Sequence, residues 1–355
     1  MSKDSFGSLF RVTTYGESHG PGLGGIIQGC PPGIALSEDI IQRELDKRKP
    51  GQGAASTRRK EADLVQILSG VFEGRTTGTA IGFHIANQDQ RSRDYSGIKD
   101  IYRPGHGDIT YEAKYGIRDY RGGGRSSGRE TVSRVAAGAV AQEFLRTLGI
   151  RVLAYTAELG GIPARVQDMA GAQKRPFFSP DPEVVSIWEE LVQEVKSQGD
   201  SLGGIVEIRA ENVPAGLGEP VFDKLDARLA YALMGVGAVK GVEIGAGFAA
   251  SRMRGSENND QMGPDGFLSN HAGGVLAGIT SGQPLVVRAG VKPIPSIAIT
   301  QKTMTRQGTQ TRVNIGGRHD ISAIPRIVPV LKSMVMLVLA DMVLLQRAVK
   351  TTENR

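Results

Sequence analysis

The stretch Arg121-Gly122-Gly123-Gly124-Arg125-Ser126-Ser127-Gly128-Arg129-Glu130-Thr131 leads directly into a helical pattern of small and apolar residues that extends to about Leu148. Consecutive glycines leave backbone N–H groups accessible, and the N-terminus of a helix adds positive potential. The arginines offer bidentate contacts to phosphate or carboxylate groups, and the two serines offer hydroxyl donors. Arginines crowded beside a helix start repel one another unless an anion is present. The stretch therefore predicts an anion site, with a flexible loop of solvated arginines as the alternative.

Further elements are predicted on both sides of this stretch. Apolar residues at helical spacing, with caps and stop signals, predict helices over 38–49, from 181 onward, over 223–234 and over 325–349. Short β-like runs lie at 24–28, 204–209, 242–248 and 284–289. Because helices and strands alternate irregularly between frequent glycine turns, the pattern favours an α+β fold over a doubly wound sheet.

Composition narrows the class of protein. Cys30 is the only cysteine among 355 residues, which excludes an internal disulfide and a cysteine metal cluster and fits a reducing compartment. No metal site is predicted.

The formal charge of +6 suits anionic substrates or a weak nucleic-acid preference. The apolar run Met334–Leu345 is interrupted by Asp341 and is too short to span a bilayer, and the first residues lack a signal-like segment. A cytoplasmic protein without a membrane partner is expected.

Two histidines lie in glycine-rich turns. The first is His19 in Gly16-Glu17-Ser18-His19-Gly20, and the second is His106 in Arg103-Pro104-Gly105-His106-Gly107-Asp108. Histidine titrates near neutrality, so both are candidate proton donors, and Arg103 is a candidate anion ligand. The alternatives are a solvent-facing turn histidine for the first motif and an ordinary surface loop for the second.

Three weaker stretches combine donors with a restricted backbone. Gly316-Gly317-Arg318-His319-Asp320 places an arginine, a histidine and a carboxylate just before the last predicted helix, where a simple local ion pair is the alternative. The other two stretches are 269–274 and 292–296. His84, inside the apolar run 81–85, is assigned no role.

Taken in order, the motifs Gly-Glu-Ser-His-Gly, Arg-Pro-Gly-His, Gly-Arg-Ser-Ser-Gly-Arg-Glu-Thr and Gly-Arg-His-Asp resemble those of the chorismate synthase family. The resemblance extends from about Phe6 to Arg347 and includes intervening stretches at 70–74 and 87–92. Four ordered motifs with collinear intervening sequence are far more specific than any single glycine loop.

The resemblance implies a lyase reaction, the anti-1,4-elimination of phosphate from 5-enolpyruvylshikimate 3-phosphate to give chorismate, in aromatic amino acid biosynthesis. It implies a requirement for reduced FMN without net redox change, and NADPH is a candidate reductant. The implied fold is a single α+β domain over 1–355, with helices sandwiched between antiparallel β layers. A homotetramer is implied as well, and residues 350–355 are expected to form a disordered tail.

Residue by residue, the resemblance implies catalytic roles for His19, His106 and Asp320. It implies that His19 protonates the leaving phosphate, that His106 protonates the flavin N1 region, and that Asp320 assists the flavin N5. The residues implied to bind substrate are Arg48, Arg103, Arg129 and Arg134, with Arg48 also implied for NADP. The residues implied to bind the flavin are Arg125, Ser126, Ser127, Gly237, Ala238, Ala277, Lys292, Pro293, Ile294, Pro295, Ser296 and Arg318.

Some positions depart from the family pattern. Ala54 replaces a common arginine, Ile321 replaces a proline, and Lys332 replaces a glutamate in the last helix. None of these positions carries an implied proton-transfer group, so activity is expected to persist.

Two other classes of protein remain open from the residues. A nucleic-acid binder is disfavoured because aromatic residues make up only 5% of the chain and the glycine–arginine motif occurs once. A flavin- or NADPH-dependent oxidoreductase acting on an anionic substrate is the stronger alternative. Its dinucleotide fingerprint is only approached at 20–24, with no convincing helix after it.

Overall fold

Two five-stranded sheets form the outer layers of the fold in the computed structural model, which describes residues 3–49, 55, 62–88, 99–315 and 319–349. Within each sheet, the neighbouring strands pair antiparallel. The first sheet has the order β1 (Ser5–Phe6), β2 (Arg11–Gly16), β3 (Gly22–Gln28), β7 (Ile81–Ala86) and β4 (Val65–Ile67). The second has the order β11 (Val239–Ile244), β16 (Leu285–Val291), β10 (Gly204–Glu211), β8 (Arg151–Leu159) and β9 (Ile162–Pro163).

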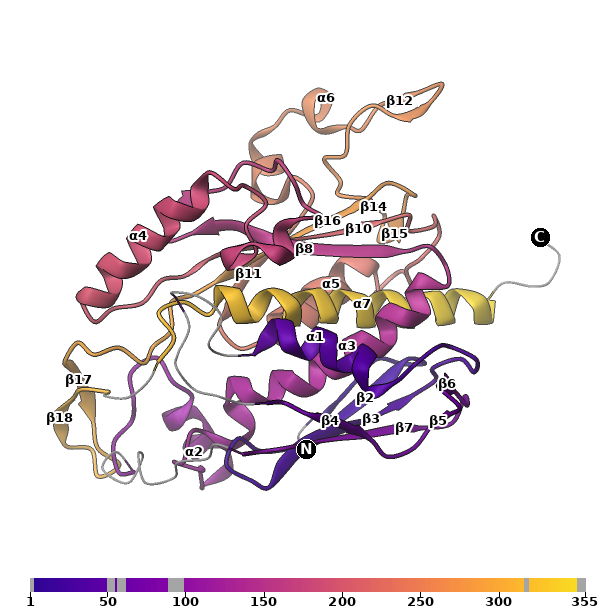
Figure 1. Ribbon diagram of the computed structural model, residues 1–355. Helices are drawn as coiled ribbons and strands as arrows, with labels where there is room; N and C mark the ends of the chain where they lie inside the picture. The colour runs from indigo at the N-terminus through magenta and orange to yellow at the C-terminus, as the bar shows by residue number, and fades with distance from the viewer. Residues whose placement is uncertain (1–2, 50–54, 56–61, 89–98, 316–318, 350–355) are drawn as a thin grey trace.

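Helices fill the space between the sheets. Figure 1 shows α7 (Ile324–Val349) running through the middle of the molecule, with α1 (Glu38–Arg48) and α3 (Thr131–Arg146) between it and the first sheet. The predicted α+β sandwich is therefore confirmed. The other helices are α2 (Asp108–Tyr115), α4 (Val184–Ser197), α5 (Leu225–Met234) and α6 (Gly255–Asn258). The other strands in the described residues form four hairpins, and each of these strands is two or four residues long. The hairpins are β5–β6 (Val71–Phe72, Arg75–Thr76), β12–β13 (Met262–Gly263, Gly266–Phe267), β14–β15 (Val275–Leu276, Ile279–Thr280) and β17–β18 (Gln301–Met304, Gln310–Val313).

The helix α7 is the central element of the core. It is long and apolar enough to cross a bilayer by length and composition, yet 89% of its most apolar window is buried inside the protein. Its charged residue Asp341 is buried and accepts hydrogen bonds from the backbone N–H groups of Ser8, Leu9 and Phe10, at 2.9, 2.7 and 2.9 Å. Those three residues form the turn between β1 and β2. Asp341, which interrupts the apolar run, therefore attaches the β1–β2 turn of the first sheet to α7.

Two more contacts determine how α7 packs. Gly138 of α3 faces Ser333, and a Cβ at Gly138 would lie 2.3 Å from the Ser333 Cβ, so only glycine permits this crossing. Lys332, the departure from the family pattern, donates to Gln142 Oε1 at 2.7 Å and lies 3.4 Å from Glu44 Oε2. Burial lowers the pKa of the Lys332 amine, and the Glu44 carboxylate opposes this shift. The lysine is therefore accommodated as a bridge between α1, α3 and α7.

Most predicted elements are found within a few residues of their expected positions. The run 242–248 is the clearest exception, because β11 ends at Ile244 and residues Gly247–Arg252 form a 3₁₀ helix. Gly245, with φ +59°, and Gly247, with φ +55°, turn the chain at this point. The strand β8 and the helix α2 were not predicted.

We expect Asp341→Asn to destabilise the fold, because an amide cannot accept all three backbone N–H bonds with the strength of a carboxylate. Hydrogen bonds to charged groups contribute about 1.5–3 kcal/mol, so the free energy of unfolding should fall by about that amount. Thermal and urea unfolding measure this. Glu190→Gln, on the exposed side of α4, is the control. Equal midpoints for the two variants would show that the β1–β2 turn does not depend on the Asp341 charge.

Candidate active site

The glycine-rich segment 121–131 forms a series of tight turns before α3. Gly122, Gly123 and Gly124 have φ values of +89°, +88° and +54°, a region that L side chains rarely adopt. Two 3₁₀ turns, Gly124–Ser126 and Gly128–Glu130, follow and lead directly into the helix. Because the chain changes direction at each turn, the three arginines at 125, 129 and 134 reach different partners.

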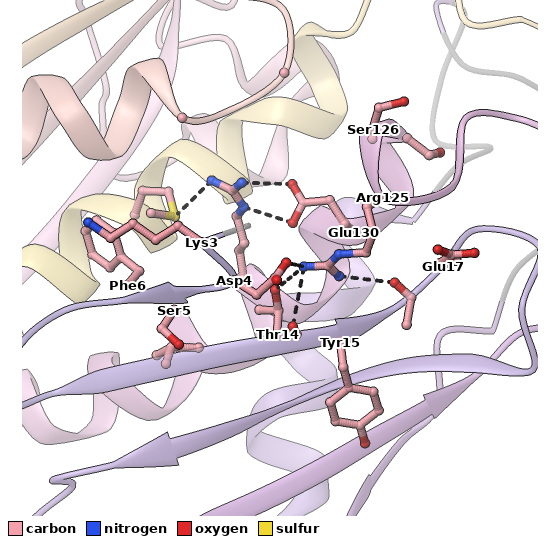
Figure 2. A pocket seen from close by; sticks show the side chains of 18 of the residues that line it. Lys3, Asp4, Ser5, Phe6, Thr14, Tyr15, Glu17, Arg125, Ser126 and Glu130 are labelled. Carbon is pink, nitrogen blue, oxygen red and sulfur yellow. Dashed lines mark hydrogen bonds and ion pairs between the residues drawn. The ribbon is translucent and has the colours of Figure 1, made fainter. Parts of the chain in front are cut away.

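A cavity of about 1020 Å³ opens beside this segment. Its walls come from the N-terminal strands, α2, the glycine segment, α3, α5 and α7 (Figure 2). Four residues expected to bind flavin line it, namely Arg125, Ser126, Ser127 and Gly237, together with Arg134 from the expected substrate set. The structure thus brings part of both predicted sets to one cavity.

Arginines in the cavity wall are paired with carboxylates of the protein. Arg125 donates to Asp4 Oδ1 at 3.0 Å and to Thr14 Oγ1 at 2.8 Å, and Figure 2 shows its guanidinium beside both residues. Arg134 makes a two-point contact with Glu130, at 3.0 Å for each nitrogen. The expectation that these arginines would repel one another without a bound anion is therefore wrong, since protein carboxylates supply the compensating charge.

Next to the end of the glycine segment lies a second group of charges, which we call the guanidinium cluster: Arg48, Arg129, Arg326, Asp63 and Asp320. Asp63 accepts hydrogen bonds from Arg48 Nη1, at 3.4 Å, and from Arg129 Nη1. Arg326 Nη1 donates to Asp320 Oδ2 at 2.7 Å. The cluster joins α1, the start of α3 and the start of α7, so residues far apart in the sequence meet here.

Arg48 is enclosed by protein atoms and is only 2% exposed. Its Nε donates to Thr131 Oγ1 at 3.0 Å, and its Nη2 donates to the Gly128 carbonyl at 2.9 Å. Burial, and then the positive charge of Arg326, lower the pKa of Arg48 to about 9, while Asp63 raises it. Arg48 therefore holds the turn that precedes α3.

The loop that carries His19 packs against the glycine segment. A Cβ at Gly122 would lie 2.5 Å from His19 Cε1, so the absence of a side chain there makes room for the imidazole. His19 Nδ1 lies 3.0 Å from Ser18 Oγ. The Asn87 amide donates to the Glu17 and Gly20 carbonyls at 2.9 and 2.8 Å, and its Oδ1 accepts from Arg129 Nε at 3.1 Å. Asn87 thus links the His19 loop to the guanidinium cluster.

His106 lies in a third group that the structure brings together. Its Nδ1 is 2.9 Å from the Pro104 carbonyl and its Nε2 is 2.9 Å from Ser296 Oγ. Since a carbonyl can only accept, Nδ1 carries the proton and Nε2 accepts from the serine hydroxyl. Lys292 N donates to the Ala238 carbonyl at 2.9 Å, which joins two of the stretches expected to bind flavin. The segment 292–296 follows β16 directly.

Arg103, Ala277 and Arg318 are the expected site residues that remain. Arg103 is held by Asp108, with Nε and Nη2 each 2.8 Å from a carboxylate oxygen, so its guanidinium is engaged within its own loop. Ala277 occupies the turn between β14 and β15 with φ +52°, and its neighbour Gly278 accepts a hydrogen bond from Leu225 N at 2.8 Å. Arg318 lies outside the described residues.

Four residues of the site were missed in the sequence: Asp4, Asp63, Asn87 and Glu130. Glu130 could have been found, because it lies four residues before Arg134 on one helix. Asp63 and Asn87 precede Arg129 by 66 and 42 residues, and no local pattern connects them to it.

The His106 environment predicts a measurable pH dependence. Burial first, and then the neighbouring Arg103 charge, lower the pKa of His106 from 6.5 to about 4. The unfolded chain therefore binds a proton at a higher pH than the folded chain, and stability contributed by neutral His106 is lost as the pH falls from 6.5 towards 4. Between pH 6.5 and 4.5 we expect His106→Gln to lose about 2 kcal/mol less stability than the wild type. Urea unfolding at both pH values measures this, and parallel losses would contradict it.

Comparisons with known proteins show which family this chain is similar to. A family model described as chorismate synthase matches residues 10–344. The chorismate synthase of Maridesulfovibrio salexigens is 71% identical over 347 residues, which cover 98% of this chain and 99% of that protein. The chorismate synthase of Nitratidesulfovibrio vulgaris (strain Hildenborough) is 66% identical over 353 residues, which cover 99% of this chain and 100% of that protein.

A solved structure supports the same relationship at the level of the fold. A crystal structure of a chorismate synthase aligns with a TM-score of 0.76 at 34% identity, over 96% of this chain and 93% of that chain. Sequence and fold agree over nearly the full length, and the chain belongs to the chorismate synthase family.

Proposed function

We propose that the chorismate synthase reaction of this chain takes place where the cavity meets the glycine segment 121–131. The observation that carries this proposal is the cavity of about 1020 Å³ with Arg125, Arg134 and two serine hydroxyls in its wall. The substrate, 5-enolpyruvylshikimate 3-phosphate, carries two carboxylates and a phosphate. A wall of guanidinium groups offsets the mutual repulsion of these charges and stabilises the departing phosphate.

The residues present fit an FMN cofactor. The cavity lies at the upper end of the range of roughly 300–1,000 Å³ for ligand pockets, so it has room for a flavin together with a small acid. Arg125, Ser126 and Ser127 would hold it with charged and hydroxyl donors, and Gly237 gives a wall without a side chain. When bound, reduced FMN supplies electron density as phosphate leaves. Ala238, with φ +74°, and the segment 292–296 would form the adjoining wall.

For the substrate we propose Arg129 and Arg134 as direct anion ligands, and Arg103 as a ligand once it is released from Asp108. Arg48 has all three side-chain nitrogens bonded to protein groups. This favours a supporting role for Arg48 over direct contact with substrate or NADPH.

His106 would move a proton through Nε2, the nitrogen that faces Ser296. A neutral imidazole at pH 7 gains a proton only when a nearby anion raises its pKa, so an anionic ligand and protonation of His106 should be coupled. For His19, which lies beside Gly122 of the glycine segment, we propose protonation of the leaving phosphate. Asp320, oriented by Arg326, is proposed to assist the flavin N5.

We further propose that the whole chain acts as one domain and that four copies assemble. Large apolar side chains exposed on this chain support assembly, above all Phe222, which is 93% exposed. Others that are prominently exposed are Val221, Phe248, Met262 and Leu268. Cys30 is a free, buried thiol, which supports work in the reducing cytoplasm.

Phosphate release under oxygen-free conditions tests the proposed cofactor. With FMN reduced chemically and the named substrate added, inorganic phosphate should appear while the flavin absorbance stays that of reduced FMN. A reaction without flavin is the control. Oxidation of one flavin per turnover would support the oxidoreductase alternative instead.

His106→Ala should lower kcat by about 10²–10⁴-fold, the range typical of general acid–base groups. The Kd for FMN is measured on the same variant, because the imidazole also contacts Ser296 of the proposed flavin wall and its loss could act through flavin binding. Stopped-flow turnover and flavin fluorescence separate the two quantities. His271→Gln, in the region of α6 and the β12–β13 hairpin, is the matched control. Wild-type turnover in His106→Ala would remove the proposed proton-transfer role.

A further inference from the structure

Asp63 is a buried carboxylate at the centre of the guanidinium cluster. Its side chain is 0% exposed, and it lies two residues before β4. Its φ of +49° is in the left-handed region, where an aspartate is tolerated better than most residues but where strain persists only if the surroundings impose it. The backbone is therefore held in an unusual conformation that points this carboxylate at the arginines.

One carboxylate bridges two arginines. Oδ1 accepts from Arg129 Nη1, and Oδ2 accepts from Arg48 Nη1 at 3.4 Å. Arg48 in turn holds both ends of the turn that precedes α3, through the Gly128 carbonyl and the Thr131 hydroxyl. Arg129 lies between those two attachment points. Asp63 thus fixes the Arg129 side chain directly and its backbone through Arg48.

Two other carboxylates near the cluster, among the residues that the structure describes, are already engaged. Asp320 contacts Arg326, and Glu130 contacts Arg134. Arg48 and Arg129 are both largely buried, with side chains 2% and 4% exposed, so water screens their repulsion poorly. Removing one partner from a buried ion pair leaves charge uncompensated, and the two guanidinium groups would be expected to separate.

We propose that Asp63 is a positioning residue for the elimination reaction: it holds the Arg129 guanidinium, and through Arg48 the Gly128–Thr131 turn, in the orientation that receives the anionic substrate. The proposal rests on the proposed role of Arg129 as a substrate ligand. Asp63 acts through the arginines and makes no contact with substrate of its own. This role depends on where the Asp63 carboxylate oxygens lie relative to Arg48 and Arg129, and not only on the negative charge.

A purely electrostatic role for Asp63 predicts the opposite change in substrate affinity. If Asp63 merely offset positive charge, its removal would leave the site more cationic and would tighten binding of a substrate with three anionic groups. If it positions Arg129, its removal should weaken binding, because a displaced guanidinium loses a hydrogen bond to a charged group, which is worth on the order of 10–100-fold in affinity. Substrate affinity therefore separates the two.

The test measures the Kd of 5-enolpyruvylshikimate 3-phosphate by calorimetry, on enzyme with oxidised FMN so that no turnover occurs. Asp63→Asn should raise this Kd by about 10–100-fold, with the FMN Kd, from flavin fluorescence, changed less than about twofold. Asp181→Asn is the matched control: it removes another buried carboxylate, which accepts from the backbone N–H groups of Arg165 and Glu183 and does not line the cavity, and it should keep the wild-type substrate Kd. An unchanged or lower substrate Kd in Asp63→Asn would overturn the proposal.

Asp63→Glu keeps the charge but moves the carboxylate by about one methylene, and it serves if Asp63→Asn fails to fold. Positioning predicts a raised substrate Kd for this variant as well, whereas wild-type affinity would indicate that only charge matters and would refute the proposal.

A double-mutant cycle with Arg129→Ala shows whether Asp63 acts through the arginine. The Asp63→Asn effect should largely vanish in the Arg129→Ala background, and full additivity would contradict the proposed route. Wild-type substrate affinity in Arg129→Ala alone would instead remove Arg129 from the substrate site, a failure of the proposed function that is distinct from a failure of the Asp63 proposal.

Discussion

The sharing of the Asp63 carboxylate between Arg48 and Arg129 is the interaction on which the site depends. Two guanidinium groups removed from water repel strongly, and in a medium of low dielectric their separation is set by whatever negative charge lies between them. Here that charge comes from a residue just ahead of β4, while the arginines come from the last turn of α1 and the turn before α3. The first sheet, α1 and α3 are therefore constrained at one point, and the glycine segment ends there.

Arg125, Arg129 and Arg134 each contact a carboxylate, and the three carboxylates come from different parts of the chain. Asp4 comes from the N-terminal segment, Asp63 from the approach to β4, and Glu130 from the turn before α3. Such pairs hold a guanidinium in a defined rotamer without occupying all of its donors. An anion that enters the cavity then meets oriented cations, and it competes with partly exposed pairs such as Arg125–Asp4 more easily than with the buried pair at Arg129.

Local signals in the sequence predicted local structure well. The acidic start and basic end of 38–49 gave α1 correctly, and the glycine segment was correctly placed before a helix. β8 was missed because both of its faces are largely covered, which removes the alternation that marks a half-buried strand. In the site, His106 and Ser296 were identified singly, but their hydrogen bond spans 190 residues and has no local signature. The carboxylates were missed for the same reason.

Charged residues of the core helix α7 connect it to the elements around the site. α7 carries four charged residues, and three of them engage different parts of the structure. Asp341 binds the turn between β1 and β2, Lys332 bridges α1 and α3, and Arg326, at the start of the helix, orients Asp320. A buried charge is tolerated only with a partner, so each of these residues permits one arrangement of its neighbours and excludes others. The apolar faces of α7 supply the free energy of burial, whereas its few charges determine the register in which the two sheets, the helices and the guanidinium cluster are held.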